Sequence, residues 1–123
     1  MLDMTTCAAI TDVVTTYVEG MCQNDPEKLR SAMHPGCSII GHFDGGLEWE
    51  SRDGFIAVVD KAVTAPDPAP WYAIRSISVL GDVATVHVED IFLGGHYDDT
   101  LILLNHQGRW VIVSKVFYLR PAS

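Results

Sequence analysis

Two aspartates in the second half of the chain, Asp90 and Asp99, are the side chains best suited to do chemistry. They stand on either side of Gly94-Gly95, a pair of residues that favours a tight hairpin turn. With a two-residue turn at these glycines, the two carboxylates lie directly opposite each other on neighbouring strands. Their mutual repulsion would raise the pKa of one carboxyl and place a proton donor beside a proton acceptor. The structural alternative is that one of them caps the turn region or pairs with Arg75.

The same register predicts which other side chains share a pocket with this pair. If every glycine-bearing turn has two residues, alternate positions of strands 71–80, 83–92, 96–105 and 108–119 lie on one face, with Leu101 opposite Ser114 and Tyr97 opposite Tyr118. This face is mostly apolar and polar at one end, as a ligand site requires. We expect the ligand to be contacted by Tyr17, Met21, His34, Trp49, Phe55, Trp71, Arg75, Phe92, Tyr97 and Tyr118. Such aromatic walls favour a flat or ring-shaped ligand.

The opposite face of the predicted sheet carries Lys115 and Glu89 in one cross-strand row, so these two residues are expected to pair with each other rather than do chemistry. Its other side chains, including Val111, Val113 and Phe117, are too apolar for a face exposed to solvent. We therefore expect a second copy of the chain to cover this face and form a homodimer.

Three amphipathic helices are expected to cover the inner side of the sheet. Thr5 and Thr6 precede apolar residues at three- and four-residue steps from Ile10 to Met21, which predict a first helix ended by Gly20 and Asn24-Asp25. Asp25-Pro26-Glu27 begins the second helix, and Ser51 caps a third over about 52–64. A short hairpin, 37–43 and 47–50, separates the last two helices, and an antiparallel meander follows them. This order indicates an α+β fold in one domain, 1–123, with Trp110 buried against the first helix.

Composition excludes several classes of function. The formal net charge of −8 and the absence of a basic stripe argue against binding to nucleic acid or to an anionic membrane. The N-terminal residues resemble neither a signal peptide nor a membrane span, so we expect a cytoplasmic protein. The histidines are scattered and no phosphate-cradling loop is present, so neither a metal nor a cofactor is predicted.

Several motifs resemble those of the nuclear-transport-factor-2-like (NTF2-like, SnoaL-like) superfamily, and within it the small bacterial proteins described as putative lumazine-binding. They are Tyr17-Val18-Glu19-Gly20, His34-Pro35, Gly81-Asp82-Val83-Ala84, Asp99-x-Leu101-x-Leu103 and Gly108-x-Trp110-x-Ile112-x-x-Lys115-Val116-Phe117. The resemblance implies a cone-shaped, cystatin-like fold in which three N-terminal helices pack on a strongly curved, mostly antiparallel sheet. It also implies a pocket at the wide end of the cone and, in many members, a homodimer.

Three hypotheses for function follow from these observations. The first is a small-molecule-binding protein whose unknown ligand is apolar or aromatic. The second is a cofactor-independent lyase or isomerase, with Asp90 or Asp99 as the general acid or base and Tyr97 or Tyr118 polarising an oxygen. The third is an interaction module that works through its outer sheet face. The catalytic His-Asp pairing of the superfamily's dehydratases and isomerases has no residue-by-residue match here, which favours binding over catalysis.

Overall fold

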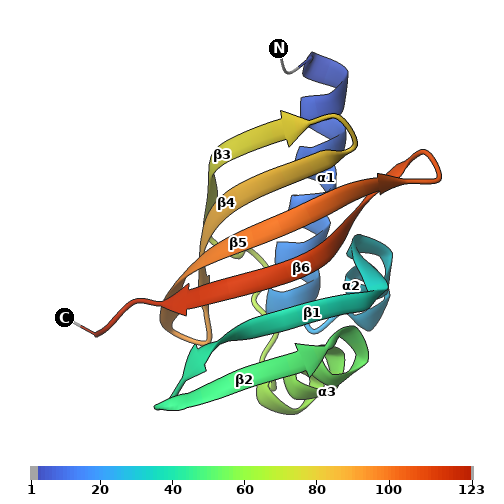
Figure 1. Ribbon diagram of the computed structural model, residues 1–123. Helices are drawn as coiled ribbons and strands as arrows, with labels where there is room; N and C mark the ends of the chain where they lie inside the picture. Colours follow the sequence, from blue (N-terminus) through green and yellow to red (C-terminus); the bar gives the residue numbers. More distant parts are fainter. Residues whose placement is uncertain (1–2, 123) are drawn as a thin grey trace.

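The computed structural model describes residues 3–122 and shows three helices packed on one face of a six-stranded sheet (Figure 1). In chain order the elements are α1 (Met4–Cys22), α2 (Pro26–Ala32), β1 (Met33–Phe43), β2 (Gly46–Ser51), α3 (Arg52–Ala62), β3 (Tyr72–Leu80), β4 (Val83–Phe92), β5 (Gly95–His106) and β6 (Arg109–Leu119). The strand order is β2-β1-β6-β5-β4-β3, with β1 and β6 parallel and the other neighbours antiparallel. The α+β class is as predicted. Only α1 and α2 precede the first strand, however, because α3 follows the β1–β2 hairpin.

The helices begin where side-chain caps satisfy their first backbone N–H groups. Asp25 caps α2 with Pro26 in its first turn, and Ser51 caps α3, both as predicted. The first helix starts earlier than expected, because Asp3 accepts a hydrogen bond from the Thr6 amide at 2.7 Å. None of the helices within residues 3–122 is long and apolar enough to cross a membrane.

The core lies between the helices and the sheet face that they cover, called the inner face below. Ile10, Val14 and Val18 of α1 are fully buried in one cluster with Leu101 and other residues of the inner face. Trp110 belongs to the same cluster and is only 7% exposed, so its predicted burial is confirmed. This packing fixes which side chains of β4, β5 and β6 can reach the space beside α1.

The β4–β5 hairpin turns one residue earlier than predicted, which shifts the register of its strands by two positions. Its turn is Leu93-Gly94, both residues having positive φ, and Phe92 pairs with Gly95. Asp90 therefore pairs with Tyr97, so the predicted pairing of the two aspartates directly across the hairpin is wrong. A shift of two positions preserves the face of every side chain, because strand side chains alternate with a period of two.

A β-bulge in β6 changes the face of every residue that follows it. Leu103 pairs with Ile112, but Ile102 pairs with Ser114, so Val113 is an extra residue in β6. The predicted pairs beyond that point, Leu101 with Ser114 and Tyr97 with Tyr118, are therefore wrong by one position. As a consequence Lys115 and Phe117 are buried on the inner face and Tyr118 is exposed on the outer face.

A second bulge, in β3, moves Arg75 out of the inner face. Ile74 pairs with Val88 but Ser76 pairs with His87, so Arg75 is the extra residue. Its guanidinium Nε donates to Glu89 Oε1 at 2.6 Å on the outer face. The predicted pairing of Glu89 with Lys115 is wrong because the bulge in β6 turns Lys115 to the inner face, whereas Glu89 lies on the outer face.

Candidate functional site

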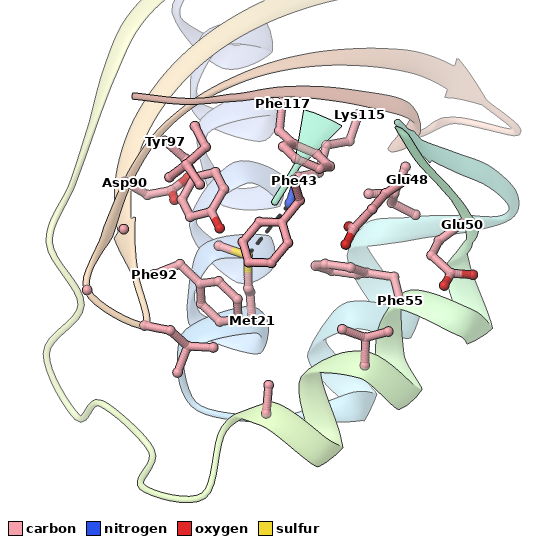
Figure 2. Close-up of a pocket in the computed structure, with 17 residues that line it drawn as sticks. Met21, Phe43, Glu48, Glu50, Phe55, Asp90, Phe92, Tyr97, Lys115 and Phe117 are labelled. Carbon is pink, nitrogen blue, oxygen red and sulfur yellow. Dashed lines mark hydrogen bonds between the residues drawn. The ribbon is translucent and has the colours of Figure 1, made fainter. Parts of the chain in front are cut away.

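A cavity of about 480 Å³ opens between the inner face of the sheet, α1 and α3 (Figure 2). This volume lies within the usual range for small-molecule sites. Most of the wall is apolar, formed by Met21, Ile39, Phe43, Phe55, Val58, Ala62, Phe92, Leu93, Phe117 and Leu119. The polar side chains in the wall are Glu48, Glu50, Asp90, Tyr97 and Lys115.

Lys115 is the central polar group of this cavity. Its side chain is only 5% exposed, and its ammonium lies 4.5 Å from the ring centroid of Phe55, 5.1 Å from that of Tyr17 and 5.6 Å from that of Phe117. Aromatic faces attract a cation, most strongly where water is excluded. The ammonium contacts Met21 Sδ at 3.7 Å, the contact dashed in Figure 2. Within residues 3–122, no oxygen atom accepts a hydrogen bond from it.

Asp90 and Asp99 form a buried carboxyl pair beside Lys115. Asp90 is 0% and Asp99 1% exposed, and Asp99 Oδ2 lies 3.9 Å from Lys115 Nζ. The Tyr17 hydroxyl donates a hydrogen bond to the same oxygen at 2.7 Å. With both carboxyls ionised, neither oxygen of Asp90 has a hydrogen-bond partner. Two buried carboxylates in contact would be strongly unfavourable, so this arrangement requires a proton.

Burial first, and then the charge of Asp99, raise the pKa of Asp90 to about 9. Asp90 is therefore protonated at neutral pH, and its hydroxyl donates to Asp99 in the hydrogen bond that the pair shares. The same two causes, burial and the Asp99 charge, hold the pKa of Tyr17 well above its usual range. In the part of the chain that the structure describes, no third His, Cys, Asp or Glu joins the pair in a group that could hold a metal ion.

The remaining polar groups of the cavity are acidic or phenolic. Glu48 and Glu50 come from β2 and lie across the cavity from Asp90 and Tyr97 (Figure 2). The Tyr97 ring centroid lies 6.0 Å from that of Phe117, and burial followed by the Asp99 charge raises the pKa of Tyr97. The cavity thus offers one ammonium surrounded by carboxyl groups and aromatic rings.

The structure brings seven of the twelve predicted site residues together. Five of them line the cavity, namely Met21, Phe55, Asp90, Phe92 and Tyr97. Tyr17 and Asp99 lie beside it, in contact with Lys115. The other five lie elsewhere, namely His34, Trp49, Trp71, Arg75 and Tyr118.

Different physical causes remove these five from the cavity. The two bulges turn Arg75 and Tyr118 to the outer face. Trp49 is 67% exposed on β2, an edge strand, and Trp71 precedes β3 and packs edge-on against His96. The remaining residue, His34, lines a separate hollow of about 200 Å³, where its Nδ1 accepts a hydrogen bond from the Gly36 amide at 2.9 Å.

Sequence reasoning missed Lys115, because a regular hairpin places it on the outer face. It also missed Phe117, which follows Lys115 by two positions, and the acidic side chains of β2. One signal was present in the sequence. Lys115 is the only charged residue between Trp110 and Leu119, in a strand that is otherwise almost wholly apolar. A charge in a strand covered on both faces indicates either a structural ion pair or a functional group.

Comparison with known protein families gives a match over most of the chain. The model of the family described as "Putative lumazine-binding" matches residues 5–118. The chain belongs to this family. The resemblance inferred from the motifs above is therefore confirmed.

Solved structures similar to this member of the Putative lumazine-binding family share its fold. An NTF-2-like protein of unknown function from Silicibacter pomeroyi DSS-3 is 42% identical, with a TM-score of 0.91 over 98% of this chain and 100% of that one. An NTF2-like protein of unknown function from Shewanella baltica OS155 is 27% identical, with a TM-score of 0.88 over 99% of each chain. A protein named Aldolase FrzH, from Cladobotryum sp, is similar in sequence. It is 24% identical over 105 residues, which make up 85% of this chain and 84% of that protein. The family and the fold together suggest small-molecule binding.

Proposed function

We propose that this protein binds a neutral, flat, ring-shaped molecule in the cavity and that the ligand presents a carbonyl oxygen to Lys115. The observation that carries the proposal is the buried Lys115 ammonium, which lines the cavity and has no oxygen acceptor among residues 3–122. Burying a charged donor without acceptors is costly, and a ligand oxygen would remove that cost. The aromatic rings of Phe55 and Phe117 supply flat apolar walls beside it.

The charges around the cavity favour a neutral ligand over an anion. The charge of Lys115 is partly balanced by Asp99 at 3.9 Å. Glu48 and Glu50 add two further carboxyl groups to the wall. An anionic ligand would be repelled by these groups, whereas a ring carbonyl accepts a hydrogen bond without carrying a charge. The family name adds support, since lumazine is a flat bicyclic molecule with ring carbonyls.

A binding titration tests this proposal with three probes: lumazine, methyl 2-naphthoate and the 2-naphthoate anion. Quenching of intrinsic or probe fluorescence gives each dissociation constant. We expect the two neutral carbonyl compounds to bind and the anion to bind more weakly. Replacing Lys115 by Met removes a hydrogen bond to a charged donor and should weaken binding of the neutral probes by about tenfold to a hundredfold.

The matched control is Lys61→Met, on the exposed side of α3 outside the cavity wall, which should leave binding unchanged. Lys115→Met leaves the buried Asp99 carboxyl without its neighbouring cation and is expected to lower stability, so circular dichroism must show that the variant is folded before its binding is compared. Unaltered affinity in Lys115→Met, or failure of all three probes to bind the native protein, would refute the proposed function.

A second candidate function, acid–base catalysis by a cofactor-independent lyase or isomerase, is favoured by the single proton shared between Asp90 and Asp99. Asp90 lines the cavity and would act as the proton donor. The similarity to a protein named Aldolase FrzH lends modest support to chemistry at a carbonyl group. Exchange of the methyl protons of 2-acetylnaphthalene in D₂O, followed by NMR, is the test. Asp90→Asn should abolish any exchange and retain binding of methyl 2-naphthoate, whereas equal exchange in both proteins would exclude this role.

A further inference from the structure

We propose that Lys115 is a nucleophile that forms an imine with an aldehyde or ketone bound in the cavity. This inference rests on the proposed binding of a carbonyl compound beside Lys115 and adds a covalent step to it. A lysine amine can attack a carbonyl carbon once a neighbouring base has taken its proton. Lys115 lines the cavity with a side chain only 5% exposed, and the Asp99 carboxyl lies 3.9 Å from its nitrogen and can act as that base.

The position of Lys115 distinguishes it from the other lysines of the chain, Lys28 and Lys61. Lys28 forms a partly exposed ion pair with Glu19 at 3.1 Å, and Lys61 lies exposed on α3. Lys115 alone among the three lines the cavity. Its nitrogen lies among aromatic rings, Met21 Sδ and the Asp99 carboxyl, and no oxygen of residues 3–122 is within hydrogen-bond distance of it. None of these groups reacts with an amine, so the nitrogen is free to attack the carbonyl carbon of a bound ligand.

The neighbouring carboxyl pair can move the protons that imine formation requires. Asp99, 3.9 Å from the ammonium, takes one proton from it, and the free amine adds to the carbonyl carbon to give a carbinolamine. Asp90 then protonates the hydroxyl of the carbinolamine, which leaves as water while the C=N bond forms. The proton held by Asp99 returns to Asp90 through the hydrogen bond that they share. The net change is ammonium plus carbonyl to protonated imine plus water, with both carboxyls restored.

The walls of the cavity indicate which class of carbonyl compound Lys115 would meet there. Lys115 and Asp90 both reach the same cavity, whose walls are mostly apolar (Figure 2). The rings of Phe55 and Phe117 lie beside the amine and keep bulk water from it. The expected substrates are therefore aromatic or otherwise apolar aldehydes and ketones, rather than small hydrated sugars or anionic keto acids.

Borohydride trapping tests the inference. The native protein is incubated with 2-naphthaldehyde, reduced with sodium borohydride, and digested for peptide mapping by mass spectrometry. We expect one naphthylmethyl group per chain, on the peptide that contains Lys115. Lys115→Arg keeps a positive charge but cannot form the imine, so it should lose this label completely. Lys61→Arg is the matched control and should be labelled like the native protein.

Methyl 2-naphthoate separates failure of the inference from failure of the proposed function, because it has a carbonyl group but forms no imine. Binding of the ester without a stable label on Lys115 would overturn the imine proposal and leave the binding function intact. Equal labelling of Lys28, Lys61 and Lys115 would overturn it as well, because it would show random surface reaction. If neither naphthyl compound binds, both the inference and the proposed function fail.

Discussion

Replacing Asp90 by Asn should flatten the dependence of folding stability on pH. The pKa of Asp90 is about 9 in the folded protein, against about 3.9 for an unfolded aspartate. Between these values the folded state holds a proton that the unfolded state has lost. The contribution is therefore fully present below about pH 4 and is lost as pH rises through about 9. At pH 7 the native protein should have lost on the order of 4 kcal/mol of unfolding free energy through this group, and Asp90→Asn should not lose it.

Urea denaturation followed by tryptophan fluorescence, at steps from about pH 5 to about pH 9, measures this effect. The variant should equal or exceed the native protein in stability, and the gap should widen toward high pH. Asp82→Asn, in the exposed β3–β4 turn, is the matched control and should keep the native pH dependence. Parallel pH profiles for the native protein and Asp90→Asn would refute the idea that Asp90 is protonated in the folded state.

Three further predictions concern the core, the Tyr17 hydrogen bond and the assembly. Trp110→Ala should cost about 3–5 kcal/mol of unfolding free energy, as for other large core truncations, and an unchanged urea midpoint would contradict its burial. Tyr17→Phe leaves a buried Asp99 oxygen without its donor and should cost about 1–3 kcal/mol in the same assay; no loss would show that this hydrogen bond contributes nothing. We also propose a homodimer through the outer sheet face. Light scattering should then give twice the chain mass and Ile102→Glu should give a monomer, whereas a native monomer at micromolar concentration would exclude it.

Much of the fold could be predicted from local sequence signals. Asp25 and Ser51 cap helices because their side chains reach backbone amides only three residues away. The turn Gln107-Gly108 could be located because positive φ at both positions favours glycine at the second. Burial of Trp110 followed from its place among apolar residues. Each of these features depends on a few neighbouring residues, which is why the sequence by itself determined them.

The face on which Lys115 lies was decided only by the tertiary structure. A single extra residue, Val113, moves Lys115 from the outer face to the cavity, because a slip of one position in a strand turns every later side chain over. Whether a bulge forms there depends on how β6 pairs with β5 on one side and with β1, distant in the chain, on the other. The predicted register of the β4–β5 hairpin was wrong, but Asp90 and Asp99 still lie together on the inner face. The hairpin is shifted by two positions, and such a shift leaves every side chain on its original face. The sequence thus determined which side chains could do chemistry, and long-range strand pairing decided that Lys115 is one of them.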